Sequence, residues 1–195
     1  MALAVRTVDR DIKQVWLTFD DFIELKEAGR FGDPDWPMEL VDGRVYRLDP
    51  VSMAHFTGSS NLVESLRSLV RRIGKWDEWV AGSNGILQLS RTRGVQPDGM
   101  VVRRTSNEFA QARDCFLAAE YAVSSRRRDL VIKPRLYAQA GVPEYWAVDQ
   151  RNGTLHVFRD PVDGLYVERL PPLSAEKTIS ALFAPDVAIP VADLL

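Results

Sequence analysis

Apolar residues recur at the spacing of a helix in three parts of the chain. The longest part covers roughly 55–75, where leucines fall on one side of the predicted helix and arginines stand between them. A shorter helix is predicted near 131–140, and it ends at Gly141, because glycine is favoured just past a helix C-terminus. Thr18 predicts a third helix, of about two turns, as its N-terminal cap.

Short apolar runs between these helices predict strands. Asp42-Gly43 and Asp163-Gly164 each stand between two such runs, which is the strongest short signal for a β-hairpin. The strands are predicted at 38–41, 44–48, 86–89, 99–102, 116–123, 144–148, 155–158 and 165–170. This order of elements indicates an α/β fold with a mixed sheet flanked by helices and a β-rich C-terminal end.

The composition is typical of one globular domain. The chain has 195 residues, of which 46% are apolar and 27% charged, enough for one well-filled core. We expect a single domain over 1–195, with an N-terminal extension over 1–17 and an irregular segment over 171–195. Residues 1–13 lack the apolar core of a secretory signal, no run is long enough to cross a bilayer, and the single Cys115 suits a reducing compartment. The sequence therefore predicts a cytoplasmic protein without a membrane partner.

Charge is distributed unevenly, although the formal net charge is only −2. Residues 60–135 carry 14 basic and 8 acidic side chains, a local +6, whereas the remainder carries 11 and 19, a local −8. A basic face around a cleft would suit a polyanion such as nucleic acid. Its expected members are Arg67, Arg71, Arg126, Arg127 and Arg128. The alternative is that these arginines only solvate helix faces.

Two acidic residues occur where the predicted strands would bury them. Asp98 opens one apolar strand, and Glu120 lies inside another. A buried carboxylate needs a partner charge or a cation, and two of them on neighbouring strands form the oxygen site that Mg²⁺ or Mn²⁺ prefers. A lysine such as Lys133 can offset an anionic transition state or orient a water molecule. Each residue alone also has an ordinary structural interpretation, but together they are the groups that phosphodiester hydrolysis needs.

The segment from Glu120 to Trp146 resembles the signature block of the Uma-two family, restriction-endonuclease-like proteins of the PD-(D/E)XK superfamily. An Asp stands nine residues after the Glu, a Lys four residues further on and a Tyr four after that, followed by Gly-Val-Pro-Glu-Tyr-Trp. Three upstream segments are similar to further motifs of the family: Glu39-Leu-Val-Asp42-Gly43, Ser52-Met-Ala-His55 and Gln96-Pro97-Asp98. Together the matches cover roughly residues 18–170.

The resemblance implies a restriction-endonuclease-like, three-layer α/β/α core with extra β-hairpins and a divalent-metal centre. It implies that Asp98, Glu120 and Glu39 bind the metal and form the catalytic set together with Lys133. Ala122 stands where the superfamily's simplest form has its lysine, so Lys133 is expected to take that role from the following helix. Three further residues are expected to line the site: His55, Tyr137 and Gln96.

The predicted function is a Mg²⁺- or Mn²⁺-dependent endonuclease or phosphodiesterase that acts on nucleic acid, with DNA as the expected substrate and a homodimer as one expected assembly. Two alternatives use the same fold: a nucleic-acid-binding module without catalysis, and a protein-interaction domain with carboxylates as buried hydrogen-bond partners. Pro134 favours the first alternative, because proline breaks a helix interior. We therefore expect the regular helix to begin at or after Lys133, with 129–132 as an irregular segment or a separate turn.

Overall fold

A six-stranded mixed sheet between two helices forms the centre of the computed structural model, which describes residues 16–195. The strands lie in the order β11-β10-β9-β8-β6-β3. Their bounds are β3 (Trp79–Gly82), β6 (Gly99–Arg103), β8 (Cys115–Ala122), β9 (Glu144–Asp149), β10 (Thr154–Val162) and β11 (Leu165–Arg169). Within this sheet β8 and β9 pair in parallel, and the other neighbours pair antiparallel.

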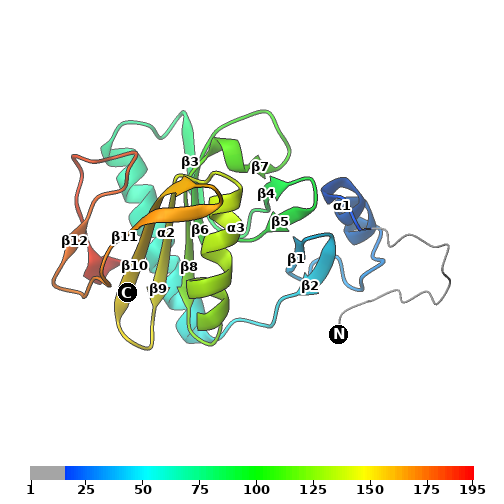
Figure 1. Ribbon diagram of the computed structural model, residues 1–195, viewed down its shortest axis with the longest axis horizontal. Helices are drawn as coiled ribbons and strands as arrows, with labels where there is room; N and C mark the ends of the chain where they lie inside the picture. The colour runs from blue at the N-terminus through cyan, green and yellow to red at the C-terminus, as the bar shows by residue number, and fades with distance from the viewer. Residues whose placement is uncertain (1–15) are drawn as a thin grey trace.

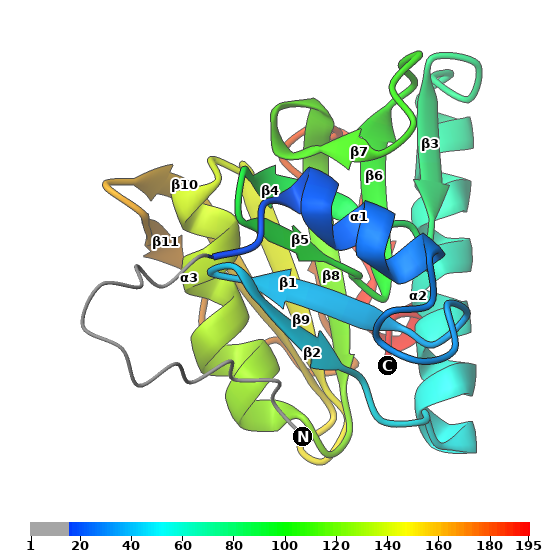
Figure 2. The same ribbon diagram turned by 90° about the vertical axis from the view of Figure 1, so that its right-hand side faces the viewer.

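One helix covers each face of this sheet. The apolar side of α2 (Met53–Arg72) packs against one face, and α3 (Lys133–Gln139) packs against the other. Figure 2 shows the strands standing between α3 on the left and α2 on the right. Because both faces are covered, β9 is buried along its whole length. The predicted three-layer α/β/α architecture with a mixed sheet is confirmed.

A second, five-stranded sheet lies on the α3 side, in the order β2-β1-β5-β4-β7. Its strands are β1 (Met38–Val41), β2 (Arg44–Arg47), β4 (Leu87–Ser90), β5 (Arg93–Val95) and β7 (Ala110–Gln111). The aromatic side of α1 (Phe19–Glu27) packs on β1 and closes a small core of its own. Figure 1 places α1 and the β1–β2 hairpin at one end of the molecule and β12 near the other.

The local signals for α1 and for both hairpins are confirmed. Thr18 caps α1 with a complete capping box, since its hydroxyl accepts from the Asp21 amide and the Asp21 carboxylate accepts from the Thr18 amide at 2.8 Å. The hairpin turn at Asp42 and Gly43 has φ values of 49° and 70°, and the turn between β10 and β11 has 51° and 77°. Positive φ at both central residues is the geometry that matches the twist of the paired strands.

The start of α3 follows the proline prediction. The α-helix begins at Lys133, and the residues before it, Arg128–Ile132, form one π-helical turn. Pro134 has no amide hydrogen to donate, so it fits only in the first turn of the helix. The Lys133 amide donates to the carbonyl of Arg128, five residues back. The wider turn therefore carries the chain from β8 into α3 without a broken helix.

Several short elements carry no strong sequence signal. Strands β3, β5 and β7 have two to four residues each, and their sequences show no clear alternation. The segment 171–195 holds the paired β12 (Thr178–Ile179) and β13 (Ile189–Pro190), and its apolar residues pack on the α2 side of the sheet. Most of the predicted N-terminal extension, 1–15, lies outside the described residues. Within 16–195, none of the helices combines the length and the apolar character that crossing a bilayer requires.

We expect Gly58→Ala to destabilise the fold. In a helix interior, alanine is normally more stabilising than glycine by about 1 kcal/mol. A Cβ at Gly58, however, would lie 1.9 Å from the Tyr121 ring on β8. Forcing apart this contact should lower the free energy of unfolding by about 1–3 kcal/mol in urea denaturation. Gly82→Ala is the matched control, because its Cβ would meet no atom within 4 Å. Equal stability of both variants would contradict a close approach of α2 to the sheet.

Candidate functional site

Charged side chains from both sheets and from α3 meet beside the C-terminal half of β8. Asp98 reaches this place because β6 and β8 run antiparallel, with Gly99 opposite Ala119. Glu120 points from β8 towards α3, and Glu39 comes from β1 of the second sheet. The structure thus brings together the three acidic residues and the lysine that the sequence singled out.

Lys133 lies at the centre of this cluster. Its ammonium group is 2.5 Å from Glu120 Oε1 and 3.3 Å from Glu39 Oε1, and each of the three side chains is only 3% exposed. Tyr137, one helical turn further along α3, donates its hydroxyl to the same Glu120 oxygen at 2.8 Å. Tyr137, which was expected to line the site, therefore contacts Glu120 directly.

Glu39 is held from three sides. Besides Lys133, its Oε1 accepts a hydrogen bond from the backbone amide of Gln96 at 3.1 Å. Its Oε2 accepts from the Arg128 guanidinium. The Gln96 backbone thus orients Glu39. These bonds also fasten the β1–β2 hairpin to the main sheet and to the turn before α3.

Asp98 and His55 form a second, more exposed part of the site. Asp98 Oδ2 accepts from the Tyr121 amide at 2.8 Å and lies 3.1 Å from His55 Nε2. His55 lies in the first turn of α2, where the Ser52 side chain caps the helix by accepting from the His55 amide. The His55 side chain is 16% exposed and the Asp98 side chain 20%, so solvent reaches this side of the cluster.

Two further members of the site, Arg128 and Asp129, are absent from the site residues predicted from the sequence. Both lie in the π-helical turn, where Ser125 donates its hydroxyl to the buried Asp129 carboxylate. The Tyr145 hydroxyl donates to the Asp129 carbonyl at 2.7 Å and so anchors the turn to β9. The regular spacing from Glu120 to Asp129 in the signature block was a signal for Asp129. Arg128 was grouped with the arginines of a basic face.

Burial and charge act against each other at Lys133 and Glu120. Burial alone would lower the pKa of Lys133, but the surrounding carboxylates, chiefly Glu120 and Glu39, raise it above its ordinary value and keep the ammonium charged. Burial raises the pKa of Glu120 well above its usual range, against the opposing effect of the Lys133 charge. Burial likewise raises the pKa of Asp129.

The pair of Asp98 and His55 has the opposite balance. Although burial opposes it, the hydrogen bonds from His55 and from the Tyr121 amide lower the pKa of Asp98. The hydrogen bond to Asp98 raises the pKa of His55 above its ordinary value of 6.5. Asp98 is therefore more readily ionised than Glu120 or Asp129.

The charges of the cluster do not balance. Four carboxyl groups (Glu39, Asp98, Glu120 and Asp129) surround the two permanent cations Lys133 and Arg128, which leaves a formal −2 when all four are ionised and His55 is neutral. One divalent cation would cancel this excess, and carboxylate oxygens are the donors that Mg²⁺ and Mn²⁺ prefer. The donor set thus fits such an ion in charge and chemistry. Within residues 16–195, however, no three His, Cys, Asp or Glu side chains stand ready as ligands of one ion, and Lys133 and Arg128 hold oxygens of Glu39 and Glu120.

Three of the five arginines that were expected on one basic face pair with separate acidic side chains. Arg128 binds Glu39, and Arg126 makes two hydrogen bonds to the buried Asp149 at 2.8 and 2.6 Å. Arg71 pairs with Glu64 on α2. With a helical rise of 1.5 Å per residue, Arg71 lies about 24 Å along α2 from His55. Arg67 instead donates to the Ala81 carbonyl at 3.2 Å, so net charge does not indicate which partners these arginines take.

Comparisons with known proteins agree with this architecture. The model of the family described as "Uma2: Putative restriction endonuclease" matches residues 19–192. The chain is similar in structure to a crystal structure of "a putative nuclease belonging to DUF820" from Anabaena variabilis ATCC 29413, with a TM-score of 0.68 and 17% sequence identity. The similarity covers 91% of this chain and 97% of that chain. No curated protein matches the sequence.

The two histidines of the chain should titrate on opposite sides of the ordinary value of 6.5. Asp98 raises the pKa of His55, whereas burial lowers that of His156. Asp98→Asn should return the His55 pKa towards or below 6.5 and leave His156 unchanged, as followed by NMR of the ring protons. Because the folded-state pKa of His55 is raised, its contribution to stability is complete below the unfolded pKa and is lost as pH rises through the folded pKa. An unchanged His55 titration in Asp98→Asn would contradict the hydrogen bond.

Lys133→Met should leave two buried carboxylates without their shared cation. Breaking a buried ion pair from one side costs about 3–5 kcal/mol, and we expect a loss of that size in urea denaturation at neutral pH. Lys75→Met is the control, because the Lys75–Glu78 pair is exposed and such pairs contribute about 0–1 kcal/mol. A loss no larger than that of the control would show that Lys133 does not balance buried charge.

Proposed function

Because this chain belongs to the Uma2 family of restriction-endonuclease-like proteins, we propose that it is a divalent-metal-dependent nuclease that hydrolyses phosphodiester bonds. The observation that carries the proposal is the cluster of four carboxyl groups around Lys133 and Arg128, with a formal excess of two negative charges when all four are ionised and His55 is neutral. A structural cluster would gain most from complete charge balance, since uncompensated buried charge is costly. An excess that one divalent cation would cancel is what a metal-dependent site needs.

Asp98, Glu120 and Glu39 are the residues that would hold the metal, Mg²⁺ or Mn²⁺. When bound, the ion would supply Lewis-acid activation of a phosphate oxygen and of the attacking water. Asp98 suits this role, because its lowered pKa keeps it ionised at neutral pH. The backbone amides of Tyr121 and Gln96 fix the orientations of Asp98 and Glu39, so these two carboxylates are positioned in advance.

Lys133 is the proposed electrostatic catalyst. Its raised pKa keeps it charged, and a preorganised cation in a site of low polarity stabilises the negative charge that develops on phosphate. Tyr137 holds Glu120 against Lys133 and thereby restricts the ammonium to one side of the site. His55 stands on the solvent side of Asp98, where it can accept or donate a proton near neutral pH.

The same contacts favour a second candidate function, a nucleic-acid-binding module without catalysis. Lys133 and Arg128 occupy carboxylate oxygens that a metal would need. If these cations do not move aside, the site cannot take up an ion. In either case we propose nucleic acid as the partner, with DNA as the substrate of the nuclease and a homodimer as its assembly.

Asp98→Asn should abolish metal-dependent cleavage of DNA while the fold survives, and Glu120→Gln should abolish it too, with a loss of stability like that of Lys133→Met because it breaks the same buried pair. Each change removes the charge and keeps the shape of the side chain. Loss of activity should exceed 10²-fold, because groups that stabilise charge in the transition state commonly contribute that much. The measurement is nicking of supercoiled plasmid with Mg²⁺ or Mn²⁺, together with calorimetric titration of the ion.

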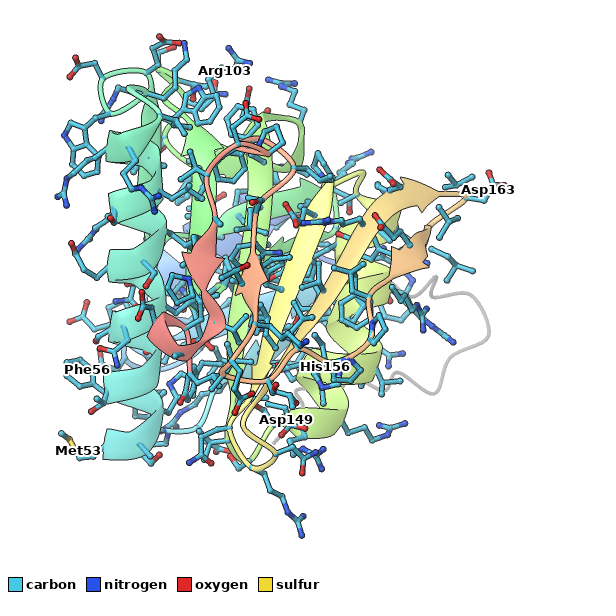
Figure 3. All side chains as sticks on the ribbon, turned by 90° about the vertical axis from the view of Figure 1, so that its left-hand side faces the viewer. Met53, Phe56, Arg103, Asp149, His156 and Asp163 are labelled. Atoms are coloured by element: carbon cyan, nitrogen blue, oxygen red, sulfur yellow. The ribbon has the colours of Figure 1, made fainter. Side chains whose placement is uncertain are left out.

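Asp163→Asn is the control for these variants. It makes the same chemical change at the tip of the β10–β11 hairpin, which Figure 3 shows projecting from the sheet at the edge of the molecule. Cleavage by Glu120→Gln at the rate of this control would refute the nuclease assignment. Metal-independent DNA binding without any cleavage by the unmodified chain would favour the binding module instead.

A further inference from the structure

A hollow of about 730 Å³ opens next to the carboxylate cluster, on the side of Gln96. Its walls come from α1 and the segment after it, from the β3–β4 connection, from β6 and from the start of β7. This volume lies within the roughly 300–1,000 Å³ that is typical of small-molecule sites. Neither the family match nor the carboxylate cluster gives this hollow a role.

The floor of the hollow is apolar. Ile86, Met100 and Phe109 line it, and Met100 is only 7% exposed. Gly85 allows the chain to pass this floor, since a Cβ there would lie 2.6 Å from the Met100 methyl group. The Trp36 ring stands at the rim with 37% exposure, and the Arg47 guanidinium lies 3.0 Å from its centroid. The guanidinium covers one face of this ring, so a flat, apolar ligand has the floor and the remaining exposed part of Trp36 to stack on.

The rim carries one cation besides its hydrogen-bond acceptors: Lys26 also lines the hollow, and its ammonium group donates to the Pro34 carbonyl. Asp35 and Glu108 are exposed, and neither takes part in an ion pair within the described range. Asn84 and Gln96 add two side-chain amides. Carboxylates repel a phosphate but accept hydrogen bonds from the exocyclic amino groups of bases, and Asn or Gln can pair with adenine. The rim thus suits the edge of a base better than the backbone of a nucleic acid.

The hollow and the carboxylate cluster share one short segment. Gln96 lines the hollow, and its backbone amide donates to Glu39 Oε1 at 3.1 Å. Asp98 follows two residues later, and Met100 follows two residues after that on β6. A nucleotide whose phosphate lies at the carboxylates therefore has its base within reach of the hollow.

We infer that this hollow binds a base of the strand that is cleaved, next to the scissile phosphate. It prefers bases that carry an exocyclic amino group over thymine, which has none. This inference rests on the proposed nuclease function, because it takes the carboxylate cluster as the place of the phosphate. Trp36 stacks on the base, and Asp35 and Glu108 read its amino group.

Binding of short single strands tests the preference without cleavage. Fluorescence anisotropy of labelled oligo(dA), oligo(dC) and oligo(dT) is measured with the unmodified chain in EDTA. We expect oligo(dA) and oligo(dC) to bind about tenfold more tightly than oligo(dT), within the range for one specific base contact. Equal affinities, or no binding of any strand, would overturn the inference.

Matched variants locate the preference. The double variant Asp35→Asn, Glu108→Gln should lose the difference between the strands, whereas Asp49→Asn, an exposed change outside the hollow, should keep it. Trp36→Ala should weaken every strand about tenfold through lost stacking. Trp76→Ala is its control, since Trp76 is equally exposed and also has an arginine over its ring but lies near the C-terminal end of α2. A preference that survives in the double variant would refute the role of the hollow.

Cleavage by the unmodified chain separates this inference from the proposed function. If a DNA pool of random sequence is cut with Mg²⁺ and the double variant cuts with the same base profile, the hollow has no role and the nuclease assignment stands. If nothing is cut but the strands bind with a preference that depends on Asp35 and Glu108, the base site stands and the catalytic proposal fails.

Discussion

The contact of the Lys133 ammonium with two carboxylates is the interaction on which the candidate site depends. Glu120 belongs to the main sheet and Glu39 to the second sheet, while Lys133 comes from α3 between them. Each carboxylate alone would be an expensive buried charge. Because one cation compensates both carboxylates, the charge balance of the site depends on the packing of these three elements against one another. Apolar packing of α3 on the sheet brings the lysine there, through Leu136 and Tyr137.

The sequence predicted the parts of the site that depend on local chemistry. Two Asp-Gly turns gave both hairpins, and an acidic residue in an apolar strand gave Glu120. The family resemblance supplied Lys133 and Glu39. What could not be predicted depends on long-range docking. Arg128 reaches Glu39 only because the hairpin lies against the π-helical turn. In the same way, β3 and β5 are strands because neighbouring strands pair with them. Their few residues show no alternation of apolar and polar side chains from which a strand could be predicted.

Pro134 has a different role from the one that first suggested a damaged site. A proline in the first turn of α3 stops the α-helical hydrogen bonds from extending backwards, and the chain before it takes the wider π-helical turn. This turn presents Arg128 and Asp129 to the same cluster that Lys133 enters from the helix. The departure from the family pattern is therefore compatible with a complete set of charged groups. Turns of this kind occur frequently at functional sites.

The way Glu39 joins the cluster also constrains how the protein folds. Arg128 and Glu39 are 89 positions apart in the sequence, so their contact closes a long loop. Closing this loop costs conformational entropy, which opposes the stability that the contact contributes. The strand that carries Glu120, by contrast, lies only 13 positions from Lys133. The packing of the β1–β2 hairpin excludes water and completes the cluster, so the chemical centre depends on a contact between segments that lie far apart in the chain.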